Sequence, residues 1–196
     1  MNTAWDDIKI CQHILSTNFP KLEDSNHFLA LKSCFDLAVD CETVLDVGCC
    51  KAELAEAFPN LNYTGADLKH VVENVSKILR PSLKYIHFDA NSDDYSFMSN
   101  YDIIVMNSFL SEMPNGTEIL SKVLSHAKKY VVIHRQDIQD ITTTVNYETY
   151  GGMNTVNLIL SKEHINKITN KHDCKIIFET QSFLEHPEKR SLLISK

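Results

Sequence analysis

Three aspartates, each at the end of a short apolar run, are the first candidates for a functional site in this sequence. Asp46 lies in VLDVG, Asp67 in YTGADL and Asp89 in LKYIHFDA. The first run turns through Gly48 into the helix-like AELAEAF, which is the pattern of a buried strand, a tight turn and a helix. In open α/β folds the carboxyl ends of parallel strands share one edge, where nucleotides bind. The sequence therefore predicts a rim of three carboxylates at the ligand-binding edge of one sheet.

The charge of the first turn limits the kind of ligand. A dinucleotide places its pyrophosphate on glycine amides at the start of a helix, in G-x-G-x-x-G spacing. This loop has one glycine, Gly48, and the carboxylate of Asp46 lies two residues before it. A carboxylate is a poor neighbour for phosphate and a good partner for an ammonium group. The loop therefore favours a ligand with a cationic group and argues against a nicotinamide-dependent oxidoreductase.

Size and composition indicate one globular domain over 1–196. The chain has 196 residues, of which 43% are hydrophobic and 23% are charged. No apolar run approaches the roughly 20 residues that a membrane helix needs, so we expect no membrane partner. The opening MNTAWDDIKI has acids where a signal peptide has basic residues, so we expect a cytoplasmic protein.

Charge and cysteine spacing restrict the partners. The formal net charge of -7 argues against a nucleic-acid partner and favours a small molecule. The six cysteines show no paired C-x-x-C spacing, so we expect reduced thiols and no zinc cluster. His164 and His172 have no third ligand at usable spacing, so we expect no metal. The oligomeric state is left open by the sequence.

The central part of the chain, 41–135, alternates between strand and helix patterns, which predicts an α/β fold with a mostly parallel sheet. Its last two strands are the apolar runs YDIIVMN and KYVVIHR, of the kind found in central parallel strands. The helix before the third strand is expected to end before Pro81. The other expected strands cover 44–47, 62–66 and 83–88, and the other expected helices cover 52–58 and 117–127.

The segments outside this frame differ in pattern. Two helices are expected within 1–40, the second capped by Asp24 or Ser25. A closing helix, capped by Ser161, and an antiparallel strand pair are expected within 161–196. Both flanks are predicted to pack on the central sheet.

The segment 136–160 is predicted to be an insertion over the open edge of the sheet. Three consecutive threonines and the pair Gly151-Gly152 are typical of a loop or mobile segment. We expect this insertion and the two leading helices to form the pocket for the substrate, here called the acceptor pocket, because they lie outside the repeating strand and helix pattern.

Together these motifs resemble those of the class I S-adenosylmethionine-dependent methyltransferases. VLDVGCCKA is similar to their first motif, and YTGADLK resembles the second, with Asp67 lying 21 residues beyond Asp46. FDANSDD and YDIIVMNSFLSEMP resemble the third and fourth, so the match covers roughly 40–135. The resemblance implies a Rossmann-like three-layer sandwich with a mostly parallel seven-stranded sheet, an antiparallel C-terminal strand and two extra N-terminal helices.

The resemblance also implies S-adenosylmethionine as the cofactor and a place for each of its parts. Asp67 would accept hydrogen bonds from the ribose hydroxyls, Asp89 with the Ala90 backbone would hold the adenine edge, and Asn107 would lie by the methionine end. Asp46 would bind the amino group, directly or through water. The remaining residues expected at the cofactor are Gly48, Cys49 and Leu68.

The chemistry that this cofactor implies needs few further groups. Methyl transfer is an in-line displacement at a carbon activated by a positive sulfur, so positioning and exclusion of water supply much of the catalysis. We expect transfer to an oxygen, nitrogen or carbon nucleophile of a small molecule. His134 and Glu112 are the candidate catalytic residues, with His134 taking the acceptor's proton. The candidate substrate-binding residues are Arg135, Tyr147 and Tyr150.

Several of these assignments have a plainer alternative. Asp67 could only cap the helix that follows it, and Asp89 could only shape the polar link after it. Asp102 opens its strand at the opposite edge of the sheet and is expected to be structural. Glu112 could be a solvated acid before a turn, and Tyr147 could simply pack its loop against the protein.

The glycine loop departs from the resemblance. Where the family commonly has its second and third glycines, this sequence has Cys50 and Ala52, and a β-carbon is unfavourable at a position that takes positive φ. A methyltransferase-like fold that has lost turnover and serves as a ligand-binding or partner subunit is therefore the alternative function. Cys49 and Cys50 could also be a reactive pair at a helix start, although small apolar filling of the loop is the simpler interpretation.

Overall fold

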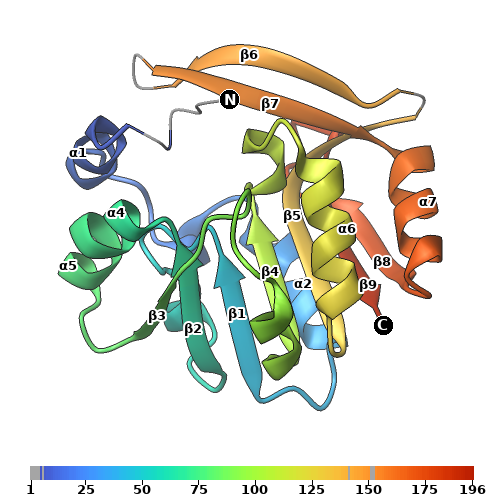
Figure 1. Cartoon of the computed structure of the whole chain (residues 1–196), viewed down its shortest axis with the longest axis horizontal. Helices are drawn as coiled ribbons and strands as arrows, with labels where there is room; N and C mark the ends of the chain where they lie inside the picture. The colour runs from blue at the N-terminus through green and yellow to red at the C-terminus, as the bar shows by residue number, and fades with distance from the viewer. Residues whose placement is uncertain (1–4, 6, 141, 151–152) are drawn as a thin grey trace.

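The computed structural model of the chain describes residues 5, 7–140, 142–150 and 153–196. Its centre is a mostly parallel sheet with helices on both faces (Figure 1). Seven strands lie in the order β3, β2, β1, β4, β5, β9, β8, and β9 runs antiparallel to both of its neighbours. This confirms the predicted Rossmann-like α/β fold with its antiparallel C-terminal strand. In that order the bounds are Lys84–His87, Asn62–Asp67, Thr43–Val47, Ile103–Asn107, Tyr130–Gln139, Lys189–Ser195 and Lys175–Gln181.

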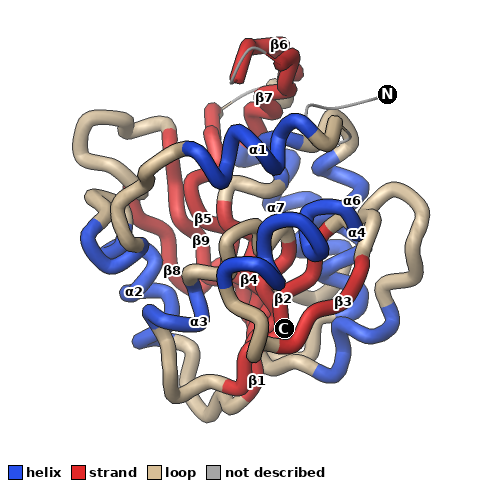
Figure 2. The backbone as a smooth tube through the Cα atoms, turned by 90° about the vertical axis from the view of Figure 1, so that its left-hand side faces the viewer, coloured by secondary structure: helices blue, strands red, loops and turns tan. Residues whose placement is uncertain are grey.

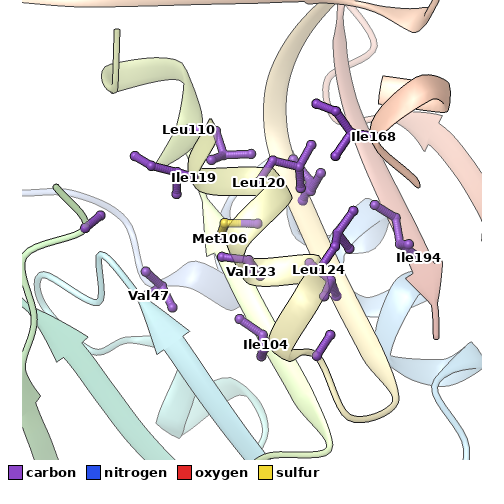
Figure 3. Packing of buried hydrophobic residues seen from close by; sticks show 14 of the residues in the cluster. Val47, Ile104, Met106, Leu110, Ile119, Leu120, Val123, Leu124, Ile168 and Ile194 are labelled. Carbon is purple, nitrogen blue, oxygen red and sulfur yellow. The ribbon is translucent and has the colours of Figure 1, made fainter. Parts of the chain in front are cut away.

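Alternate residues of the central strands supply the two cores that hold the layers together. Val44 of β1 belongs to the cluster that contains α2 (Phe28–Leu37) and α3 (Leu54–Ala57). Leu45, the next residue, belongs to the opposite cluster, which contains α6 (Gly116–His126) and α7 (Lys162–Lys171). Figure 3 shows the apolar side of α6 lying over Ile104 and Met106 of β4. The sheet is therefore buried on both faces, as parallel sheets require.

The N-terminal part forms two helices, as predicted. The first, α1 (Lys9–Ser16), packs its buried residues on the helical segment that follows β2. The predicted caps of α2, Asp24 and Ser25, are wrong, because Leu22–Asp24 forms a short 3-10 helix and α2 begins after His27. The segment after β2 consists of α4 (Lys69–Val71), a π-helical turn (Val72–Ser76) and α5 (Lys77–Leu79).

The predicted loop over 136–160 is a β-hairpin instead. Strand β5 continues to Gln139, and β6 (Thr144–Tyr150) then pairs antiparallel with β7 (Met153–Ser161). The hairpin lies across the carboxyl ends of the parallel strands (Figure 1) and stands beyond the sheet when the molecule is turned (Figure 2). Val156, Leu158 and Leu160 of β7 are buried at alternate positions, as in a strand with one face on the core. The described residues therefore hold nine strands rather than seven.

Two smaller predictions are confirmed. The hydroxyl of Ser161 accepts a hydrogen bond from the backbone N–H of His164 and caps α7. Asp102 lies at the amino end of β4, opposite the ligand-binding edge, and joins neighbouring strands as a structural residue. Across the described part of the chain, no helix has the length and apolar character needed to cross a membrane.

The carboxylate of Asp102 is surrounded by donors. It accepts from the backbone N–H groups of Glu42 (3.0 Å) and Thr43 (3.2 Å), and from the hydroxyl of Thr43 (3.0 Å). Lys128 donates from 2.8 Å, at the start of the turn into β5. Burial opposes the charge, but these hydrogen bonds hold the pKa of Asp102 well below its usual range. One side chain thereby fixes the lower ends of three adjacent strands.

Replacing Asp102 by asparagine is expected to lower the free energy of unfolding by about 1–3 kcal/mol at pH 7, because hydrogen bonds to a charged acceptor are lost. A depressed pKa contributes stability above the unfolded value near 4 and loses it as the pH falls. The difference between wild type and variant should therefore shrink between pH 5 and pH 2.5 in urea titrations. The control is Asp36→Asn, which removes an exposed pair with Lys32. Equal losses in both variants at pH 7 would contradict this role.

Candidate functional site

A cavity of about 450 Å³ lies at the carboxyl ends of the parallel strands. Ligand pockets commonly measure about 300–1,000 Å³, so this cavity has the size for a nucleoside-sized molecule. Glu112, in the segment after β4, and Arg135, in the middle of β5, line it. All eight of the predicted cofactor residues line it as well: Asp46, Gly48, Cys49, Asp67, Leu68, Asp89, Ala90 and Asn107. The structure thus brings the predicted rim together, while the role of each residue stays a prediction.

The loop after β1 keeps the backbone shape of a glycine loop although it has only one glycine. Gly48 has φ +74°, and Cys50 and Ala52 have φ +45° and +55°. A β-carbon on Gly48 would also lie 2.6 Å from a ring carbon of Phe109, so glycine is required there. Left-handed backbone costs about 1–2 kcal/mol for a residue with a β-carbon. Cys50 and Ala52 therefore adopt the backbone conformation that glycine would have there, at the cost of backbone strain.

Asp67 connects this loop to the end of β2. Its carboxylate accepts from the backbone N–H of Cys50 at 2.9 Å and from that of Leu68 at 2.8 Å. The second bond is local, to the residue that precedes α4, and α4 itself has no side-chain cap, so the plainer interpretation of Asp67 as a cap is wrong. The first spans 17 residues and holds the loop against the sheet, while the same side chain lines the cavity. Asp67 thus has a structural role and a place at the cavity together.

Asp46 and Asp67 are buried carboxylates with raised pKa values. Burial, and to a lesser extent the nearby Asp67 and Glu53, raise the pKa of Asp46 to about 7, although the hydroxyl of Tyr63 donates to it from 2.9 Å. Burial raises the pKa of Asp67 to about 6 against the effect of its two backbone donors. Acids in this state favour a ligand that brings positive charge, because a cation stabilises their ionised form.

Asp89 shapes the polar link after β3, as the plainer alternative expected, and both Asp89 and Ala90 lie at the cavity. The carboxylate of Asp89 accepts from the backbone N–H of Asn91 (2.9 Å) and the hydroxyl of Ser92 (3.1 Å), which shapes the polar link. The carbonyl of Ala90 accepts from Tyr95 at 2.7 Å. Both residues line the cavity, so contact with an adenine edge stays a prediction.

The two vicinal thiols are not a reactive pair. Burial raises the pKa of Cys49 and of Cys50 far above the ordinary value, and nearby Asp67 adds to the effect. A reactive thiol requires the opposite shift, because the thiolate is the nucleophile. Cys49 instead packs at Gly65, where a β-carbon would lie 2.7 Å from the Cys49 sulfur. The simpler interpretation, small filling of the loop, agrees with this packing.

Glu112 joins two segments outside the repeating frame. Its carboxylate accepts from the indole N–H of Trp5 and from the hydroxyl of Thr155 in β7, the latter at 3.4 Å. Burial raises the pKa of Glu112 against these donors. Glu112 is therefore no solvated acid. It lines the cavity as predicted, while its catalytic role stays a prediction.

His134 does not reach the cavity, so its predicted role as the group that takes the acceptor's proton directly is wrong. Its side chain is 0% exposed, and both ring nitrogens have protein partners, His27 at 3.0 Å and Ser191 at 2.7 Å. The reason is an irregularity of β5 at this point, because its pairing with β9 shifts register between Ile133 and Gln136 and Arg135 takes left-handed backbone with φ +57°. Arg135, the next residue, does line the cavity, and its Nε donates to Asn107 at 2.8 Å.

Of the substrate contacts predicted in the hairpin, the described one lies outside the lining of this cavity. Tyr147 is 65% exposed and does not line it, so its predicted role stays a prediction. For Tyr150 the prediction falls on a side chain outside the described residues. No described residue of 136–160 lines the cavity, and the expectation that this insertion helps to form the acceptor pocket stays a prediction.

The N-terminal segment contributes cavity residues that no sequence pattern had indicated. Their prediction would have required knowing how this segment lies across the sheet edge, and only the general expectation that it forms a pocket wall points to them. Within the described residues, no cluster of acids, histidines and cysteines has the form of a metal site. The cavity residues from this segment are Trp5, Ile14, Phe19, Pro20, Leu22, Ser25 and His27.

Replacing Asp46 by asparagine is expected to change how stability depends on pH. The folded wild type keeps a proton on Asp46 up to about pH 7, whereas an unfolded aspartate releases it near pH 4. Raising the pH through this window destabilises the wild type, and asparagine has no such proton to lose. The variant should therefore gain on the order of 2 kcal/mol relative to wild type between pH 4.5 and pH 8 in urea titrations. A difference that stays flat across this range would rule out the buried charge.

The fold is shared with many solved methyltransferases at low sequence identity. The aminopentose methyltransferase CalS10 of Micromonospora echinaspora, solved with bound S-adenosylmethionine, is 11% identical, with a TM-score of 0.64 over 100% of this chain and 98% of that one. An S-adenosylmethionine-dependent methyltransferase of Mesorhizobium loti is 10% identical, with a TM-score of 0.67 over 89% and 100%. The magnesium protoporphyrin IX methyltransferase ChlM of Synechocystis is 12% identical, with a TM-score of 0.62 over 94% and 92%.

One family matches by sequence. The family described as "Methionine biosynthesis protein MetW" matches residues 30–138, which include β1 to β4 and nearly all of β5. No curated protein matches the chain. The family match covers more than half of the chain, so the chain belongs to the MetW family. Its three-layer sandwich of helices, sheet and helices is the fold of the class I S-adenosylmethionine-dependent methyltransferases.

Proposed function

We propose that this protein binds S-adenosylmethionine in the cavity and transfers its methyl group to an oxygen, nitrogen or carbon nucleophile of a small molecule. The observation that carries the proposal is the loop after β1, in which three alternate positions take positive φ and the middle one is hydrogen-bonded to Asp67. Strained backbone of this kind concentrates at functional sites. Here it lies beside two buried acids, which suit a ligand with cationic groups.

The residues present fit such a cofactor chemically. Asp67 uses one oxygen for each of its two backbone donors, and every carboxylate oxygen has a further lone pair for a ribose hydroxyl. Asp46 supports the proposal because an ammonium group beside it would favour its ionised form. Asp89 and Ala90 would hold the adenine edge, and Asn107 would lie by the methionine end. Gly48, Cys49 and Leu68 would form the remaining wall.

The cofactor, when bound, supplies a methyl carbon activated by positive sulfur. The protein's own task is then to hold the acceptor in line with that carbon and to exclude water. Trp5 and Phe19 are suited to the second task, because they line the cavity from the N-terminal side. Arg135 is the candidate to orient the acceptor. With His134 withdrawn from the cavity, Glu112 is the only one of the two predicted catalytic residues that still faces it.

Calorimetry with S-adenosylhomocysteine should show binding to the wild type and at least tenfold weaker binding to Asp67→Ala, because hydrogen bonds to a charged acceptor are lost. Asp67→Asn keeps an acceptor oxygen and tests whether the loop itself is disturbed. The matched control is Asp94→Ala, whose exposed carboxylate bonds to the neighbouring Ser96 and does not line the cavity. Affinity unchanged in Asp67→Ala would remove the ribose assignment.

Turnover is a separate test. Wild-type protein incubated with methyl-labelled cofactor and a broad pool of small metabolites should transfer label to a small molecule. We expect Gly48→Ala to abolish transfer, because the added β-carbon meets Phe109 in a strained turn. Binding of the cofactor with no label transferred to any member of the pool would favour the ligand-binding or partner subunit.

A further inference from the structure

His27 is a buried polar residue at the cavity that the proposed function does not use. It precedes α2, is 9% exposed and lines the cavity. Its Nδ1 lies 3.0 Å from Nε2 of His134, and its ring also packs edge-on against Phe183. Its Nε2 has no hydrogen-bond partner among the described residues. Among these residues, the fully buried side-chain atoms without a partner are Oδ1 of Asn115 and Oδ1 of Asp137. Nε2 of His27 is not one of them, so it faces accessible space.

The contact between His27 and His134 is one link in a buried chain of hydrogen bonds. His134 Nδ1 lies 2.7 Å from the hydroxyl of Ser191, and that hydroxyl lies 2.8 Å from the hydroxyl of Ser182. The chain ends at the backbone N–H of Arg135, which donates to Ser182 at 3.2 Å. His134, Ser191 and Ser182 are at most 2% exposed. Solvent therefore has almost no access to the chain.

The fixed end of this chain sets its direction. A backbone N–H can only donate, so Ser182 accepts from Arg135 and its own proton has one described partner, Ser191. Ser191 then donates to Nδ1 of His134, which leaves the proton of His134 on Nε2 and directed to Nδ1 of His27. His27 is left with its own proton on Nε2. The reverse direction would leave the buried Ser182 proton without an acceptor, which folded proteins avoid.

His27 is uncharged in this arrangement. Burial, together with the positive charge of Arg135, lowers the pKa of His27 to about 4. Burial, the neighbouring His27 and Arg135 also lower the pKa of His134 well below its ordinary value. Among the described residues, His134 contacts His27 and Arg135 acts on it through its charge. A neutral ring with Nδ1 accepting from His134 presents an N–H donor to the cavity.

We propose that His27 and Arg135 form a carboxylate-binding site at the Asn107 end of the cavity, where the Nε2–H of His27 donates to the ligand's carboxylate. Arg135 supplies positive charge, and its Nε is held by Asn107. The other cavity acids make the rest of the rim unfavourable for an anion; they are Asp46, Glu53, Asp67, Asp89 and Glu112. Lys51 also lines the cavity, but its ammonium group donates to the carbonyl of Thr17 and lies over the ring of Phe19. Two sources share this chemistry, the methionine carboxylate of the cofactor and a carboxylate on the acceptor. The first of these rests on the proposed function.

The tautomer can be measured without any ligand. Nitrogen-15 NMR of histidine-labelled protein at pH 7 should show His27 protonated on Nε2 and His134 protonated on Nε2. In Ser182→Ala the chain loses the group that sets its direction, so a mixture of tautomers is expected for both rings. A wild-type His27 protonated on Nδ1 would overturn the proposal, because its lone pair would then face the cavity as a base.

Two ligands then distinguish the sources. If the cofactor's carboxylate is the ligand, His27→Phe weakens S-adenosylhomocysteine about tenfold, as loss of one charge-assisted bond requires, and leaves 5′-methylthioadenosine unchanged. If the acceptor's carboxylate is the ligand, wild type and His27→Phe bind S-adenosylhomocysteine with equal affinity. Benzoate added to wild type with bound S-adenosylhomocysteine then shifts the His27 Nε2 resonance.

The matched control is His164→Phe, an exposed histidine on α7 that does not line the cavity and should leave both ligands unchanged. The proposed site is refuted if His27→Phe changes the affinity for neither nucleoside and benzoate has no effect on the His27 resonance. Wild-type protein that binds neither nucleoside would refute the proposed cofactor instead. The tautomer and the benzoate response would still decide the role of His27.

Discussion

The hydrogen bond from the Cys50 backbone to Asp67 is the interaction on which the rest of the site depends. It joins the turn after β1 to the end of β2, and so fixes the loop that forms one wall of the cavity. Cys50 and Ala52 hold left-handed backbone that glycine would adopt freely, at about 1–2 kcal/mol each. Such strain persists only where neighbouring contacts over-determine the conformation. The carboxylate of Asp67 supplies that contact, which explains how two glycines could be replaced while the loop kept its path.

The same carboxylate shows why the site is unstable without a cation. Asp46 and Asp67 are both buried, and their raised pKa values mean that the folded protein opposes their ionisation. A well-packed hydrophobic residue at either position would be favourable for folding. Acids held in this state are typical of sites in which a ligand provides the missing charge. The hydrogen bond from Tyr63 and the two backbone donors keep these side chains aimed at one cavity rather than relieving their burial.

The sequence predicted the parts of this protein that depend on local periodicity. Buried parallel strands are continuous apolar runs, so the positions of Asp46, Asp67 and Asp89 at strand ends followed from pattern alone. The hairpin was missed because Gly151-Gly152 and the threonines suggested a loop, although Val156, Leu158 and Leu160 place apolar residues at alternate positions of β7. His134 was misplaced by one position, because the irregularity of β5 at Arg135, which the apolar pattern does not show, decides which side chain meets the cavity. His27 had no local signal, because its role arises from contacts with residues 107 and more positions away.

The two ends of the cavity are built on different physical principles. At the β1 to β3 end, backbone geometry and buried acids come from the repeating frame, whose strands are fixed by apolar cores on both faces. At the β4 to β5 end, the contacts are polar and join distant segments, with Trp5 and Thr155 meeting at Glu112 and His27 meeting His134. Polar contacts depend on geometry more than apolar packing does, and an unmatched buried partner is costly. Selectivity for the ligand's charged group therefore belongs to this end, while the other end is suited to any ligand with the same cationic nucleoside.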